Sequence, residues 1–247
     1  MLDEKLPVTD HLHELRKRLI WIVLTFVIAM AVNFAFAGDI FTWIRQDSLQ
    51  NVKIHALSPG DSLKIYMQLS FIGAMVFTTP VILYHLWQFV RPGLKKREQR
   101  AALLYIPAAI GLFLCGLLFG YYVIFPYLIE FSSSLNRELN AEEMYGIYQY
   151  FGFMLNIILP LALFFELPVI VLFLTYIRLL SPEVLRKSRR VAYLLMVIIA
   201  AIITPPDVIS NILVGIPLVV LYEVSVWLST WLYQRLDQAD TAETLNE

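Results

Sequence analysis

The sequence predicts an all-α integral membrane protein with six transmembrane helices, and three observations lead to this prediction. Of the 247 residues, 59% are hydrophobic and 16% are charged, whereas a soluble domain is about 45–50% apolar and about 25% charged. The apolar residues are concentrated in long blocks, which is the pattern of membrane-spanning helices. Basic residues gather in alternate connections between these blocks. Composition therefore points away from an ordinary soluble domain.

The predicted spans follow one another along a single membrane domain, residues 1–235. A spanning helix needs about 20 mostly apolar residues, since each residue adds about 1.5 Å. The first four blocks satisfy this length and the last two are short. The six spans are expected at residues 19–37, 65–90, 103–129, 151–177, 191–204 and 208–224. Residues 236–247 are acidic and polar, and we expect them to form a flexible cytoplasmic tail.

The sequence "TPPD" (204–207) separates the last two predicted spans. It is either a tight turn between two helices or a bend within one helix. Pro205 and Pro206 remove two N–H donors and restrict the residue before them, which favours the turn. The 14 residues of 191–204 would then reach only about 21 Å across a hydrocarbon core of about 30 Å.

The distribution of lysine and arginine predicts the orientation of the chain. Of the 19 basic residues, 15 lie in the two terminal segments and in the connections 91–100 and 178–190. The alternate connections hold the other four. Because cytoplasmic loops carry the excess of Lys and Arg, both termini are expected in the cytoplasm.

Motifs for catalysis and for metal or cofactor binding are missing from the sequence. Its single cysteine, Cys115, lies in an apolar block, so no disulfide within the chain is possible. The four histidines are scattered, and no zinc pattern, P-loop, GxGxxG or GxSxG motif is present. We therefore expect no metal and no cofactor.

Glu166 is the first candidate for a functional residue because it lies inside the predicted span 151–177. An ionisable side chain at the bilayer centre costs about 2.5–3.5 kcal/mol on insertion scales, and it normally faces a bundle interior or a wet cavity. Pro160 and Pro168 flank it, and each frees a carbonyl in the preceding turn. A kinked helix would thus present a carboxyl group to water. The alternative is a neutral side chain that hydrogen-bonds between helices.

Four further polar residues are candidates. Glu98 is the only acid among five basic residues over 91–100, and it either pairs with those neighbours or receives a cationic guest. Asp207 is expected to cap the helix that follows the "TPPD" turn. Thr204 and Asn211 are either polar contacts inside the hairpin or contacts for another membrane helix.

Six segments form an ordered set of motifs along the chain. They are "HLHELRKRL" (11–19), "LSPGDSLKIYMQLSF" (57–71), "PVILYHLWQFVRPGLKKREQR" (80–100), "FFELPV" (164–169), "SPEVLRKSRRVAY" (181–193) and "TPPDVIS" (204–210). In this order they resemble the TatC family, the polytopic core of the twin-arginine protein translocase. The resemblance covers residues 9–235.

This resemblance implies a fold and a function. TatC proteins have six spans with both termini inside, arranged as a concave, glove-like bundle in the bacterial plasma (inner) membrane. They receive signal peptides with consecutive arginines and help to export folded proteins, driven by the proton-motive force. Their partners are single-span TatA- and TatB-type subunits, further copies of TatC in a larger complex, and the lipid bilayer. The family implies no enzymatic activity, no cofactor and no nucleic acid.

The resemblance also implies site residues by position. An arginine fork matches a carboxylate, so two adjacent arginines need two acceptors. Glu14 and Glu98 match the acids that bind the arginine pair. Leu15, Arg16, Phe89 and Pro92 lie in the matching cytoplasmic motifs. Glu166 matches a residue that faces the membrane-embedded cavity, and Thr204 and Asn211 match a polar patch near which partner helices dock.

Two other functions fit parts of the sequence. A secondary transporter of a small cation would suit Glu166, the proline kinks and a weak similarity between residues 79–100 and 167–190, but no paired ion site accompanies the single central acid. An intramembrane protease needs a nucleophile with a base, or paired acids, at membrane depth. No such pairing is evident in the sequence.

Overall fold

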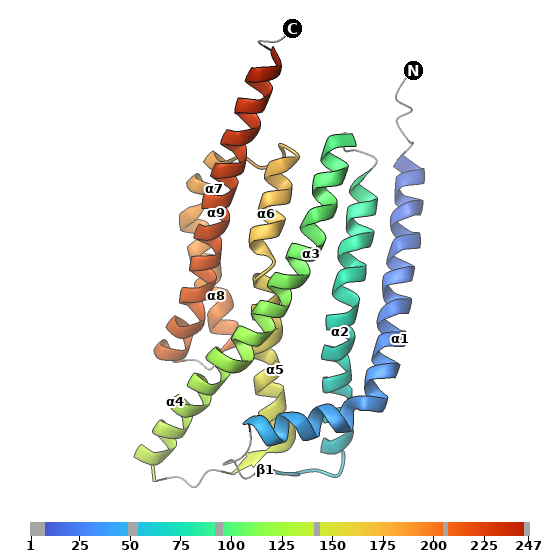
Figure 1. Cartoon of the computed structure of the whole chain (residues 1–247). Helices are drawn as coiled ribbons and strands as arrows, with labels where there is room; N and C mark the ends of the chain where they lie inside the picture. The colour runs from blue at the N-terminus through green and yellow to red at the C-terminus, as the bar shows by residue number, and fades with distance from the viewer. Residues whose placement is uncertain (1–7, 49–53, 92–95, 141–143, 205–206, 245–247) are drawn as a thin grey trace. The chain divides into compact units, whose positions relative to one another are not determined.

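The computed structural model describes residues 8–48, 54–91, 96–140, 144–204 and 207–244. Helices dominate this part of the chain (Figure 1). The elements are α1 (Val8–Ser48), β1 (Ile54–His55), α2 (Asp61–Val90), α3 (Lys96–Phe119), the π-helix η2 (Gly120–Ile124), α4 (Phe125–Glu138), β2 (Tyr145–Gly146), α5 (Ile147–Phe164), α6 (Leu167–Tyr176), α7 (Pro182–Lys187), α8 (Arg189–Ile203) and α9 (Val208–Thr244).

Five helical stretches of the described residues are long and apolar enough to cross a membrane. They are His13–Gln46, Asp61–Phe89, Tyr105–Glu138, Ile147–Tyr176 and Val208–Gln238. The predicted all-α membrane fold is therefore confirmed. The fifth predicted span, 191–204, corresponds to α8, whose 15 residues extend only about 22 Å at 1.5 Å per residue. The count of six spans and their orientation stay predictions.

The chain divides into two compact units. The first contains Met1–Ile106 and Met144–Phe151, and the second contains Pro107–Glu143 and Gly152–Glu247. In the first unit, α1 and α2 pack side by side (Figure 1). Gly73 of α2 faces Asn33 of α1 so closely that a Cβ atom there would lie 2.1 Å from the Asn33 Oδ1 atom. The missing side chain therefore permits this close approach.

Two connecting segments of the first unit meet in a short parallel ladder, where Ile54 pairs with Tyr145 and His55 pairs with Gly146. Asp61 then fastens the connection after β1 to the first turn of α2. Its buried Oδ2 atom accepts hydrogen bonds from the backbone N–H groups of Leu57 at 3.0 Å and Ser58 at 2.9 Å.

In the second unit, α3 and η2 approach α5 at two glycines. A Cβ atom on Gly116 would lie 2.7 Å from the Cα atom of Ala162, and one on Gly120 would lie 3.1 Å from the Cα atom of Ile158. Small residues four apart let two membrane helices approach at backbone distance. This stretch of α5 leads directly to Glu166.

Helix α6 ends in a Schellman motif that starts the basic connection 178–190. The N–H of Leu179 donates to the carbonyl of Leu174 at 3.0 Å, and the N–H of Arg178 donates to that of Thr175 at 3.0 Å. Arg178 has a φ of 60°, the left-handed conformation that such a helix end requires. The turn reverses the chain toward α7.

Helices α8 and α9 form the hairpin that the "TPPD" turn predicts. Thr204 is extended, with φ −100° and ψ 161°, and ends α8. Arg189 in the first turn of α8 pairs with Glu223 in the middle of α9, so the two helices run antiparallel. Pro205 and Pro206 themselves lie outside the described residues.

Helix α9 continues well beyond the last predicted span. It has 37 residues and continues to Thr244, whereas the sequence predicts a short span, 208–224, and a flexible tail from residue 236. The physical reason is that residues 218–244 contain neither glycine nor proline, so nothing stops the helix where the apolar stretch ends. The backbone is therefore helical over 236–244.

Candidate functional site

Helices α1 and α2 border a small, partly open apolar cavity of about 90 Å³. Positions three and four apart on each helix face the same side, which places one stripe from each helix on the cavity. The lining residues are Leu15, Arg18, Leu19 and Ile22 of α1 and Ile82, His85, Leu86 and Phe89 of α2. The structure thus brings together Leu15 and Phe89, two of the residues that the family resemblance singles out.

A carboxylate is paired with one of the residues that line this cavity. Glu14, one residue before Leu15, accepts a hydrogen bond on Oε1 from the guanidinium of Arg18, which follows it by about one helical turn. The Glu14 side chain is 32% exposed and that of Arg18 is 12% exposed. No hydrogen bond from a described residue reaches the second carboxylate oxygen, Oε2. Arg16 and Leu15 are exposed.

The second predicted acceptor is placed only by its backbone. Glu98 falls in the first turn of α3, which begins at Lys96, and its side chain lies outside the described part of the structure. Pro92 also lies outside the described residues. The proximity of Glu14 and Glu98 therefore stays a prediction.

Glu166 lies at a break between α5 and α6. Its N–H donates to the carbonyl of Leu163 at 3.2 Å, one residue short of the α-helical partner, while its own carbonyl accepts from the N–H of Ile170 at 3.0 Å. Pro168, in the first turn of α6, has no N–H to continue the ladder. The predicted kink is thus present as an interruption of the helix at residues 165 and 166.

The Glu166 side chain is buried without a complete set of partners. The residue is 9% exposed, and its Oε1 atom has no hydrogen-bond partner among the described residues. Gly116 of α3 packs against the preceding residue, Phe165, since a Cβ atom on Gly116 would lie 2.9 Å from the Cβ atom of Phe165. An unpaired buried carboxyl oxygen costs free energy, so this arrangement makes Glu166 a candidate for function.

The residues around the α8–α9 turn differ in their bonding. Asp207 accepts the backbone N–H of Ser210 on Oδ1 at 2.7 Å, which is the geometry of a helix N-cap. The buried Thr204 hydroxyl donates to the carbonyl of Ala200 at 2.9 Å. The Oδ1 atom of Asn211 is buried and has no hydrogen-bond partner within the described residues. Of the two polar residues predicted to contact a partner helix, Thr204 uses its hydroxyl in a hydrogen bond within α8, whereas the buried Asn211 Oδ1 atom has no hydrogen bond to a described residue.

Two cavity residues were not predicted from the sequence. They are Arg18 and His85, neither of which was among the candidate site residues. Both side chains line the α1–α2 cavity, and the Arg18 Nε and His85 Nδ1 atoms are buried without a hydrogen-bond partner among the residues described. The spacing of Ile82, His85 and Phe89 on one helix face is the signal that could have identified His85.

Comparison with known proteins gives a consistent result. The family model described as "Sec-independent protein translocase protein (TatC)" matches residues 10–217. A TatC from Halalkalibacterium halodurans is 40% identical over 241 residues, which cover 97% of this chain and 95% of that protein. The TatCy protein of Bacillus subtilis is 39% identical, with 97% of this chain and 94% of that protein covered.

Solved structures agree with the sequence matches. A crystal structure of the twin-arginine translocase receptor TatC superposes with a TM-score of 0.79 at 32% identity, covering 90% of this chain and 99% of that one. A second crystal structure of that receptor, in DDM, gives a TM-score of 0.81 at 33% identity, covering 89% of this chain and 99% of that one.

Proposed function

The chain belongs to the TatC family of Sec-independent protein translocase proteins, and from this premise we propose that it is the signal-peptide receptor and core subunit of a translocase in a bacterial plasma membrane. Folded proteins with twin-arginine signal peptides are its cargo, and the proton-motive force drives their export. Single-span TatA- or TatB-type subunits assemble with it. Both termini are cytoplasmic, and the chain acts in transport without catalysing a reaction.

The observation that carries this proposal is the carboxylate paired with Arg18 of the α1–α2 cavity. Arg18 occupies Oε1 of Glu14, so an arriving guanidinium can bind the other oxygen or exchange with Arg18, because a carboxylate offers about four acceptor sites. Leu15 and Phe89 provide apolar surface beside it. Glu98 supplies the second acceptor that two consecutive arginines require.

Crosslinking of a twin-arginine signal peptide to the purified protein in lipid nanodiscs tests the proposal. We expect Glu14→Gln and Glu98→Gln each to lower the yield about tenfold, because a hydrogen bond to a charged group contributes about 1.5–3 kcal/mol. A peptide with both arginines changed to lysine should crosslink poorly to the unmodified chain. Glu183→Gln is the matched control, since Glu183 is an exposed acid in the basic connection 178–190. Equal yields for all three variants would remove both acids from the site.

Glu166 serves the same function at a different depth. We propose that its carboxyl group keeps a groove in the membrane polar, so that the apolar part of the signal or a partner helix can lodge there. The break in the α5–α6 helix and the unpaired Oε1 atom support this role.

Asn211 provides a contact for a partner subunit in this proposal, because a membrane-buried amide oxygen without a partner can accept a hydrogen bond from another helix. Co-purification of a tagged single-span subunit measures this contact, and Asn211→Leu should reduce its recovery. The same preparation distinguishes the cation-transporter alternative, which the match to a translocase family disfavours. Substrate-dependent cation flux into liposomes that contain this chain alone would overturn the translocase proposal.

A further inference from the structure

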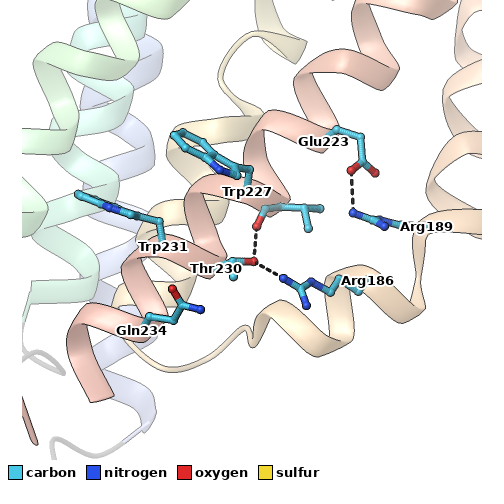
Figure 2. A pocket seen from close by; sticks show the side chains of 8 residues that line it. Arg186, Arg189, Glu223, Trp227, Thr230, Trp231 and Gln234 are labelled. Atoms are coloured by element: carbon cyan, nitrogen blue, oxygen red, sulfur yellow. Dashed lines mark hydrogen bonds and ion pairs between the residues drawn. The ribbon is translucent and has the colours of Figure 1, made fainter. Parts of the chain in front are cut away.

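A second cavity, of about 420 Å³, lies among helices α7, α8 and α9 of the second unit (Figure 2). Arg186 of α7 and Arg189 of α8 line one side of it. Glu223, Trp227 and Trp231 of α9 line the other at intervals of four residues, which places them on one helix face, and Thr230 lies beside them. The Tyr222 hydroxyl fastens α7 to α9 by donating to the carbonyl of Leu185 at 2.7 Å.

The two arginines of this cavity are held by other side chains but keep unused donors. Arg186 donates to the Thr230 hydroxyl at 3.2 Å, and Arg189 donates to Glu223 Oε2 at 2.7 Å (Figure 2). A guanidinium has five N–H donors, and the Nε of Arg189 is buried with no hydrogen-bond partner in the described part of the chain. With two arginines and one glutamate, the lining carries one net positive charge.

The two tryptophans of the cavity lie where the surface of α9 changes from apolar to polar. Trp227 is 67% exposed and Trp231 is 45% exposed. They follow the exposed aliphatic face of α9, which includes Ile212, Ile216 and Val220. Polar residues begin immediately afterwards with Gln234 and Arg235, and the Arg235 guanidinium lies 4.0 Å above the Trp231 ring. Exposed tryptophans between an apolar and a polar helix surface are typical of the lipid headgroup level.

We propose that this cavity binds the phosphodiester of an anionic phospholipid, with Arg186 and Arg189 as its donors and Trp227 and Trp231 against the glycerol and upper acyl chains. Planar guanidinium groups match phosphate oxygens, and basic pockets between membrane helices accept acidic headgroups. The net positive charge of the lining favours a headgroup without a cation of its own. This site is separate from the proposed signal-peptide site and does not depend on it.

Native mass spectrometry of the protein, released from micelles that contain dioleoyl phosphatidylglycerol or dioleoyl phosphatidylcholine, tests the assignment. We expect bound phosphatidylglycerol to exceed phosphatidylcholine, and Arg186→Gln to lower its occupancy about fivefold, the effect expected of one cation at an anionic membrane surface. Arg190→Gln is the matched control, because Arg190 is an exposed arginine of the same connection that does not line the cavity. Thr230→Val should give a smaller loss than Arg186→Gln, because it removes only the hydroxyl that orients Arg186.

Three outcomes would overturn the proposal. They are equal occupancy in Arg186→Gln and Arg190→Gln, equal binding of the two lipids, and displacement of phosphatidylglycerol by millimolar inorganic phosphate, which would identify a site for soluble phosphate instead. Arg186→Gln is preferred to a change at Arg189, because Arg189 pairs with Glu223 and its loss could disturb the α8–α9 hairpin. An unchanged circular dichroism melting curve verifies that the variant is folded.

Discussion

Glu166 and Glu223 are both acids within apolar helices, and the structure treats them in opposite ways. Glu166 is 9% exposed, and its Oε1 atom has no partner among the described residues. The Glu223 side chain is 37% exposed. It accepts hydrogen bonds from Arg189 at 2.7 Å and from the Tyr193 hydroxyl at 2.5 Å. One acid is buried with an oxygen that bonds to no described residue, and the other is more exposed and accepts a hydrogen bond on each of its two oxygens.

This difference suggests how to distinguish a functional acid from a structural one in a membrane helix: a structural acid has hydrogen-bond partners that hold helices together. The bonds of Glu223 join the two helices of the α8–α9 hairpin, so its charge contributes to the fold. The carboxyl group of Glu166 contributes no described side-chain bond that would offset the cost of its burial. The two acids also differ in their neighbourhood, because the α5 residues just before Glu166 pack closely against Gly116 of α3, whereas an open cavity borders Glu223.

The largest expected effect comes from filling the close contact beside Glu166. Gly116→Leu should destabilise the protein by about 1–3 kcal/mol or more, because its Cβ would meet the backbone of Ala162 at 2.7 Å. Gly111→Leu is the matched control on the same helix, since no atom lies within 4 Å of its Cβ position. Thermal unfolding in detergent, followed by circular dichroism, measures both. Equal melting temperatures would mean that α3 and α5 are not packed at backbone distance.

Removing the buried acid itself should separate stability from transport. Glu166→Leu is expected to keep or raise stability, by up to about 1–3 kcal/mol, because it eliminates an unsatisfied buried polar group. Export of a twin-arginine reporter should fall at least about tenfold, equivalent to about 1.4 kcal/mol, while signal-peptide crosslinking stays intact. Thermal unfolding and an export assay in membrane vesicles provide the two readouts. A clear loss of stability with normal export would identify Glu166 as a structural hydrogen-bonding residue.

Glu223 should behave in the opposite way to Glu166, because removing its charge should lower the stability of the protein. Glu223→Gln is expected to lower stability by about 0.5–1 kcal/mol, since both partners of the Glu223–Arg189 pair are more than one-third exposed. A double-mutant cycle with Arg189→Gln isolates the coupling between the two side chains. A coupling energy of zero would show that the hairpin does not depend on this ion pair.

The smallest effect is expected at the outermost pair of the same region. Asp237 and Arg178 approach to 2.7 Å, but their side chains are 57% and 35% exposed. Asp237→Asn should therefore change the melting temperature less than Glu223→Gln does, with a cost of under about 0.5 kcal/mol. If the order of the two variants is reversed, exposure is not what determines the strength of these pairs.

The sequence predicted the features that depend on local composition. The apolar blocks mark the helices, Pro205 and Pro206 mark the hairpin, and Pro168 marks the interruption beside Glu166, because each acts through its own backbone or its own run of residues. The Glu14–Arg18 pair follows from helix geometry alone, and the structure contains it.

Features that arise from contacts between distant residues could not be predicted in this way. Arg186 and Thr230 are 44 residues apart, and Arg189 and Glu223 are 34 apart, so the cavity among α7, α8 and α9 exists only once the hairpin has folded. The length of α9 was also not predicted from the sequence. Hydropathy shows where a helix leaves an apolar environment, but the helix itself ends only where its backbone hydrogen bonds end.

The two-residue ladder between β1 and β2 has a consequence for the first unit. It ties Ile54 to Tyr145 and so closes a chain ring that contains α2, α3 and α4 between its ends. A ladder this short is only marginally stable in isolation, so the packing of the two connecting segments must support it. Gly146 is part of that packing, because a Cβ atom there would lie 2.7 Å from the Leu57 Cδ1 atom and a larger residue would push the two segments apart.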